Sequence, residues 1–242
     1  MANDPGTWNG LPDAESASAE LWSGLLGRLE AAVGTLHDAP NDLIALAEEG
    51  RDRPEAIVAG EALQRALEDL RATWLLLKAG YMAAAAATIA DLWEHAMLAT
   101  CVVRDEPFAQ TFMKPEPVER PEPGELAERA VQLVAEPGAD AERTMLEFSV
   151  GYEWLRQVKH RGYERVTGGV EDDAAGLRVT ARPVGNQFDP DDVRMMLAVA
   201  FIALRRALGQ LALTLSVDME SGAGQELAAR IEGAWKVVQE TR

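Results

Sequence analysis

The chain has 242 residues, 48% of them hydrophobic, and its formal net charge is -17 at pH 7. This length predicts one or two domains, and 20 Gly, 12 Pro and a single Cys exclude collagen-like and disulfide-stabilised proteins. Apolar residues at regular spacing exclude an intrinsically disordered chain. Because nucleic acids are polyanions, so acidic a protein can bind them only through a local basic patch. The same charge disfavours anionic membrane surfaces.

Cysteine content and the longest apolar run indicate a cytoplasmic protein. Cys101 is the single cysteine, so no disulfide forms within the chain, which fits a reducing compartment. The first ten residues include acidic and turn-forming residues and no basic stretch, which does not fit a secretory signal. The apolar run 195–204 lies between two arginines and is far shorter than the ~20 residues of a membrane span. We therefore expect this run to lie within a buried helix.

Apolar residues spaced three and four apart predict a series of helices. Residues 1–13 are expected to form a flexible arm, and 41–49 a short helical turn. The main helices are expected near 14–37, 54–78, 81–103, 125–135, 139–166, 190–217 and 225–239.

Three other segments complete the predicted fold. Five prolines in 104–124 predict an extended connector, and 171–173 is expected to be an acidic loop. Alternation of apolar and polar residues predicts one short extended or hairpin segment near 177–184. The expected fold is an all-α, up-and-down bundle of five to seven helices, forming a single domain over 14–242.

Two sets of residues could form a metal site. Asp91, Glu94 and His95 lie three and four residues apart in one predicted helix, and bundle proteins build metal sites from helix-borne carboxylates and histidines. Alternatively, His37, His95 and His160 could meet from three helices. The plain structural interpretation is that the carboxylates are solvated or paired with arginine and that His95 lies between helices. No metal or other cofactor is therefore expected.

A basic stretch in the predicted helix 139–166 reverses the overall charge locally. Arg156 and His160 are four residues apart and so share a helix face. If the protein acts on RNA, we expect His160 to take the 2′-hydroxyl proton and Arg156 to stabilise charge on the phosphate. The remaining cations would hold the nucleic-acid backbone; they are Lys159, Arg161 and Arg165. The structural alternative is a helix C-terminus, where cations complement the dipole.

The order of elements resembles that of a known superfamily. A helix ends at 75–80 (LLLKAG), an Ala-rich helix leads to 92–94 (LWE), and a later helix carries Tyr152 and His160. A short extended piece and a long apolar helix follow. Over about residues 55–217 this pattern resembles the HEPN-like superfamily of bacterial helical proteins.

The resemblance implies a bundle of about five helices, frequent homodimers and, in active members, metal-independent RNA cleavage, often in toxins or phage defence. Active members separate Arg and His by four to six residues, whereas three separate Arg156 from His160. Active members also often have an Arg one turn before the Glu, where this chain has Ala90 and Asp91. An inactive relative that serves as an antitoxin, sensor or dimeric scaffold therefore fits these residues equally well.

Association with a second copy is also expected. Trp74, Trp93, Trp154 and Trp235 lie on separate predicted helices, and part of this apolar surface is expected to form a symmetric homodimer contact. Three function classes remain open: an HEPN-like ribonuclease, a metal-binding bundle and a non-catalytic interaction protein. The binding partner is expected to be RNA or a protein, and the protein is not expected to bind a membrane.

Overall fold

The computed structural model describes residues 11–48, 50–114, 121–134, 141–156 without 143, 147 and 150, 170–173, 176–179 and 190–241. The helices with complete bounds are α1 (Leu11–Leu46), α2 (Pro54–Lys78), α3 (Met82–Val102), α4 (Glu106–Phe112), α5 (Pro123–Val134), α7 (Pro190–Thr214) and α8 (Gly222–Glu240). The described residues of 141–156 are also helical, and β1 (Val170–Asp173) pairs with β2 (Gly176–Val179). The predicted all-α bundle is confirmed, with slightly more helices than the five to seven expected.

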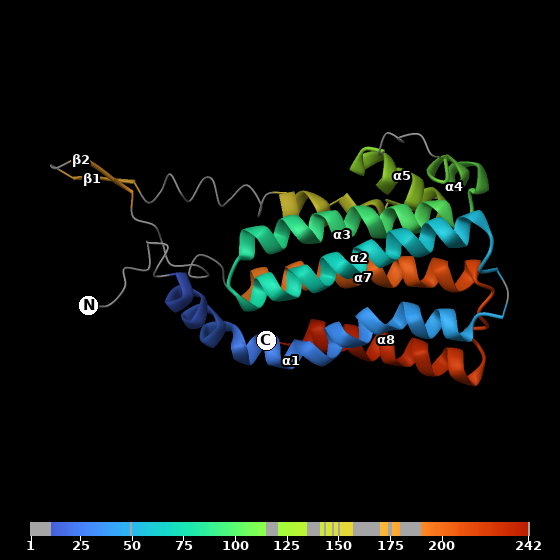
Figure 1. Cartoon of the computed structure of the whole chain (residues 1–242), viewed down its shortest axis with the longest axis horizontal. Coiled ribbons are helices and arrows are strands. Elements are labelled where there is room, and N and C mark those ends of the chain that lie inside the picture. Colours follow the sequence, from blue (N-terminus) through green and yellow to red (C-terminus); the bar gives the residue numbers. More distant parts are fainter. Residues whose placement is uncertain are drawn as a thin grey trace.

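The helices lie roughly parallel and antiparallel in one elongated bundle (Figure 1). α1 packs along α8, and α3 packs against α2, α7 and α5. α4 and α5 lie together at one end of α3, and the β1–β2 hairpin lies beyond the opposite end of the bundle (Figure 1). The long helices therefore carry the core, and the short elements lie at its margins.

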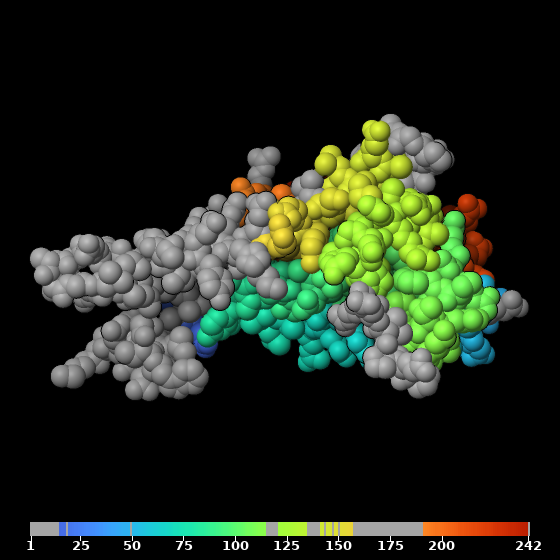
Figure 2. All heavy atoms as spheres, turned by 90° about the horizontal axis from the view of Figure 1, so that it is seen from above, coloured from blue at the N-terminus to red at the C-terminus, as the bar shows by residue number. Residues whose placement is uncertain are grey.

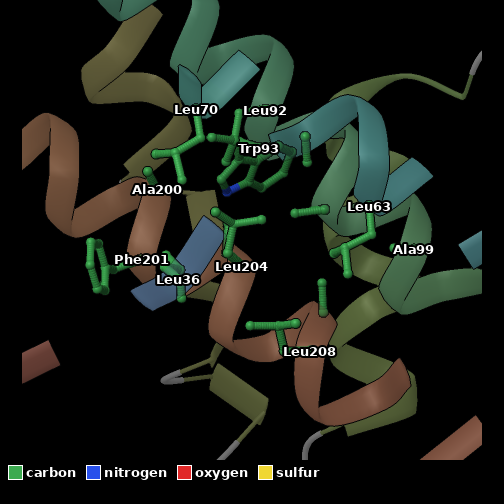
Figure 3. Close-up of a cluster of buried hydrophobic side chains, with 14 of the residues drawn as sticks. Leu36, Leu63, Leu70, Leu92, Trp93, Ala99, Ala200, Phe201, Leu204 and Leu208 are labelled. Atoms are coloured by element: carbon green, nitrogen blue, oxygen red, sulfur yellow. The ribbon is translucent and has the colours of Figure 1, made fainter. Parts of the chain in front are cut away.

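The core is centred on α7. Figure 3 shows its side chains meeting those of α1, α2 and α3 in one apolar cluster, among them Phe201 and Leu204. Within 195–204 most side chains are buried as expected, although Met195 is 49% exposed. Among the described helices, α7 alone is long and apolar enough to cross a membrane. However, 61% of that apolar window is buried in the bundle, as in the core helix of a soluble protein.

Proline and glycine set the ends of α2 as the sequence predicts. Pro54 occupies the first turn, where a missing N–H costs no hydrogen bond. Gly80 has a φ of 82°, and the Tyr81 N–H donates to the Leu76 carbonyl at 2.8 Å while the Gly80 N–H donates to that of Leu77. This is a Schellman motif, which requires a positive φ at the position that Gly80 occupies.

The N-terminal region differs from the prediction. The chain forms one helix from residue 11 to 46 through Pro40, instead of a helix at 14–37 and a separate turn at 41–49. Proline removes one backbone donor and disfavours a helix interior, but here Ala39 and Leu43 on either side are buried in the core. Tertiary burial keeps the helix continuous. Residues 11–13 are helical too, whereas 1–10 of the expected arm lie outside the described residues.

The Pro-rich stretch 104–124 is not extended throughout, which corrects the prediction. Residues 106–112 form α4, with Pro107 in its first turn and Asp105 as N-cap. The Asp105 carboxylate accepts the Phe108 N–H at 2.9 Å and pairs with Arg129 of α5. Proline is tolerated in the first turn because that N–H has no partner within the helix.

Replacing Asp105 by Ala should lower the free energy of unfolding by about 1 kcal/mol, since the helix loses its N-cap. The Phe108 N–H, followed by Arg129, holds the pKa of Asp105 below its ordinary value. The stabilisation is therefore complete above the unfolded pKa and is lost as the pH falls through the lower folded pKa. Denaturant titrations of the wild type and the variant between neutral and acidic pH measure this difference. Asp105→Asn, which keeps a capping oxygen, should lose less at neutral pH.

The extended segment is a hairpin that begins earlier than expected. β2 overlaps the predicted strand at 177–179, and the remainder, 180–184, lies outside the described residues. Its partner β1 includes 171–173, which were expected to be an acidic loop. A lone strand leaves its backbone groups unpaired, so the preceding segment supplies the second strand.

Candidate functional site

The helical segment 141–156 places Tyr152 against α3. The segment lies on the surface beside α3 and α5 (Figure 2). The Tyr152 hydroxyl donates to Glu94 Oε1 at 3.0 Å, and its ring lies 4.9 Å from the Trp93 ring, centroid to centroid. Two successive residues of α3 thus hold both the ring and the hydroxyl of Tyr152.

Tyr152 is a hydrogen-bond donor and not a base at neutral pH. Burial, followed by the charge of Glu94, raises the pKa of Tyr152 to about 12, and Asp91 adds to this effect. The phenol therefore keeps its proton near pH 7. The group that donates the hydrogen bond to Glu94 is therefore a neutral hydroxyl.

Arg156 lies one turn after Tyr152 and is exposed. Its Nε and Nη2 donate to the two carboxylate oxygens of Glu153 at 3.0 and 3.2 Å, and this bond raises the pKa of Arg156. A phosphate that binds through this edge of the guanidinium would have to compete with Glu153 for the same two donors. The carboxylates of Glu94 and Asp91 also act on the adjacent Tyr152, so the described surroundings of Arg156 are acidic.

Arg156 is the only predicted catalytic or nucleic-acid-binding residue within the described ranges. The proposed catalytic His160 and the proposed backbone contacts Lys159, Arg161 and Arg165 lie outside them. These assignments stay predictions.

The structure does not bring together Asp91, Glu94 and His95, the first set of residues considered as metal ligands. Glu94 binds Tyr152, whereas the neighbouring His95 places Nδ1 2.9 Å from Asp69 Oδ2 on α2, and Asp91 is exposed. No group of three or more His, Cys, Asp or Glu that could hold a metal ion occurs in the described part of the chain.

The three-histidine alternative has two members in the described ranges. His37 lies on α1, where its Nδ1 is 3.1 Å from the carboxylate of its neighbour Asp38, while His95 contacts α2. His160 lies outside these ranges, so the full set is not tested.

The Asp69–His95 contact links α2 to α3 in a largely buried position, with side-chain exposures of 23% and 13%. The sequence interpretation that His95 lies between helices agrees with this contact, but it did not identify Asp69. The sequence does place Asp69 directly before Leu70, an apolar position on the same predicted helix. An acidic side chain at the edge of a buried helix face needs a hydrogen-bonding partner.

An apolar hollow of about 260 Å³ lies between the segment 141–156 and α7, with Trp93 in its lining. Leu146 and Met195, which also line it, are 63% and 49% exposed. Gly151 lets the two elements approach, because a Cβ there would meet Val199 Cγ1 at 3.3 Å. The hollow has the size and chemistry to take one apolar side chain.

A second hollow, of about 360 Å³, shares Met195 and Ala198 with the first and continues toward Val238 of α8. Met195 therefore forms a ridge between two depressions. The sequence placed Met195 in a buried run and gave no indication of this surface.

Cys101 is a structural residue. It is fully buried, its Sγ lies 3.4 Å from the Leu126 carbonyl, and burial raises the pKa of the thiol to about 12. A protonated, enclosed thiol is not a nucleophile.

No family model, curated protein or solved structure matches this chain.

Proposed function

We propose that this protein is a non-catalytic interaction protein that forms a symmetric homodimer, an inactive HEPN-like relative acting in a toxin–antitoxin or phage-defence setting in the cytoplasm. The observation that carries the proposal is the apolar hollow between 141–156 and α7, edged by exposed Leu146 and Met195. Large apolar side chains beside an unfilled hollow mark an interaction surface more than an isolated exposed leucine does.

This surface is self-complementary in form. In a two-fold dimer the same patch of each copy faces the other, so the patch must contain both a projecting side chain and a recess. Leu146 and Met195 project, and the hollow between them is lined by Ala198, Val199 and Ile202. Each copy can therefore insert one apolar side chain into the recess of the other.

The surroundings of Arg156 support the non-catalytic part of the proposal. Two of its five N–H donors are already bound to Glu153, and the net charge of the chain is -17. A phosphate that uses these two donors would have to overcome both an intramolecular competitor and long-range repulsion. An apolar side chain of a partner copy meets no such competing contact in the hollow, which is lined by apolar residues.

The second candidate is a metal-independent ribonuclease with Arg156 and His160 as catalytic residues. The observation in its favour is that Arg156 is exposed at the protein surface, where a phosphate can reach it.

An RNA cleavage assay in EDTA separates the two candidates. The interaction proposal predicts no cleavage by the wild type above that of Arg156→Ala or His160→Ala. The ribonuclease candidate predicts cleavage that each of these substitutions reduces by about 10²-fold or more. Glu128→Ala, at an exposed position on α5, is the control and should behave as the wild type does.

Cleavage by the wild type that is lost in both catalytic variants would contradict the non-catalytic proposal. Thermal unfolding of each variant must accompany the assay, because loss of activity through unfolding would not implicate the side chain in chemistry.

A further inference from the structure

A separate apolar recess, distinct from the two hollows beside Met195, lies between α7 and α8 at the end of the bundle where the two helices are connected. It has a volume of about 460 Å³. Its floor consists of Leu43 of α1, Leu208 of α7 and Ile231 of α8, all buried. Gly209 and Ala228 line it with almost no side chain, which leaves the recess open between the two helices.

The recess has one charged end and one apolar end. Arg205, one turn before Gly209, pairs with Glu232, one turn after Ala228, at 3.0 Å between Nη2 and Oε2. Met219, from the connection between α7 and α8, also lines the recess. The charged end is electrically balanced and offers both hydrogen-bond donors and acceptors.

These features specify the chemistry of an occupant. We propose that this recess is a binding site for a neutral, mainly hydrocarbon molecule with one hydrogen-bonding end, such as an aliphatic alcohol. Its volume lies in the range of about 300–1,000 Å³ that is typical of small-molecule pockets, and an apolar lining with few polar groups is typical of them too. The hydrocarbon covers the leucine and isoleucine floor, and the polar end lies at the Arg205–Glu232 pair.

A charged end group fits less well. A carboxylate would lie beside the like-charged Glu232 in a chain of net charge -17, and an ammonium group would lie beside the like-charged Arg205. A hydroxyl accepts from the guanidinium and donates to the carboxylate without breaking the pair. The geometry therefore favours a neutral ligand over both charged analogues.

The test uses the environment-sensitive dye phenylnaphthylamine with the full-length protein. The dye should bind saturably, and octanol should displace it. Octanoate and octylamine should each bind about tenfold more weakly than octanol, which corresponds to the loss of one polar interaction. Gly209→Leu should weaken binding by about tenfold or more, because the new side chain occupies the recess. A Cβ at Gly209 meets nothing within 4 Å, so this variant should fold.

Gly34→Leu is the matched control. Gly34 is likewise an exposed helical glycine with nothing within 4 Å of an added Cβ, but it lies on α1 outside the recess. It should bind the dye as the wild type does. Leu146→Asp, which alters the hollow of the proposed dimer contact, should also leave binding unchanged.

Any one of three results with the wild type, Gly209→Leu or the octanol analogues would overturn this inference, and so would a fourth with Leu146→Asp. The first three are the absence of saturable dye binding to the wild type, undiminished binding to Gly209→Leu, and tighter binding of octanoate or octylamine than of octanol. Loss of dye binding in Leu146→Asp would assign the dye to the other hollow and equally reject the site. The dimer proposal is tested separately, by the mass of the protein in solution.

Discussion

Replacing Phe201 by Ala should lower the free energy of unfolding by about 3–5 kcal/mol, the range for removing a fully buried aromatic side chain. Phe201 has no exposed surface and lies in the cluster where α1, α2, α3 and α7 meet (Figure 3). Its ring centroid is 6.3 Å from that of Trp235 on α8. The substitution therefore opens a cavity at the point where the long helices converge, and denaturant unfolding measures the loss.

Leu213→Ala on the same helix is the control for this prediction. Leu213 is 55% exposed, so its truncation should change the free energy of unfolding by no more than about 0.5 kcal/mol. Equal losses for the two variants would mean that α7 is not the centre of the core.

Replacing Leu146 by Asp should convert the proposed dimer to a monomer. A carboxylate in place of a projecting apolar side chain would be buried without a partner in the dimer, at a cost of about 3 kcal/mol, or roughly a hundredfold in the dissociation constant. Because Leu146 is 63% exposed in the monomer, the folded monomer should keep its stability. Light scattering across micromolar concentrations measures the mass, and circular dichroism verifies the fold.

Leu75→Asp provides a matched control. Leu75 is 60% exposed on α2, so it has the same side chain and almost the same exposure, and it does not line the hollow. It should leave the mass unchanged. A wild-type protein that is monomeric at all these concentrations would reject the dimer outright.

The helices could be predicted from the sequence wherever a local signal defined both the buried face and the ends. The observed α2 has the predicted bounds because Pro54 begins it and Gly80, with positive φ, follows it. The prediction was wrong at two prolines. At Pro40, between the helix expected to end near 37 and the turn expected from 41, burial in the core outweighs the lost hydrogen bond. At Pro107, in the stretch expected to be extended, the first turn of a helix needs no N–H.

The surroundings of the candidate site could be predicted only in part. Apolar residues spaced three and four apart place Glu94 and His95 on one helix, but the choice of partners depends on how neighbouring helices rotate and cross. Consequently, the contacts of Glu94 with Tyr152 and of His95 with Asp69, over separations of 58 and 26 residues, could not be read from local spacing. The apolar hollow is equally a product of packing between two distant segments.

Hydrogen exchange at low and high protein concentration tests the proposed dimer contact, because it reports both association and its location. Amides in 151–156 and 193–202 should exchange more slowly as the concentration rises, and Leu146→Asp should abolish this dependence. Protection that rises with concentration only in other helices, or that does not change anywhere in the chain, would contradict a dimer formed through this hollow.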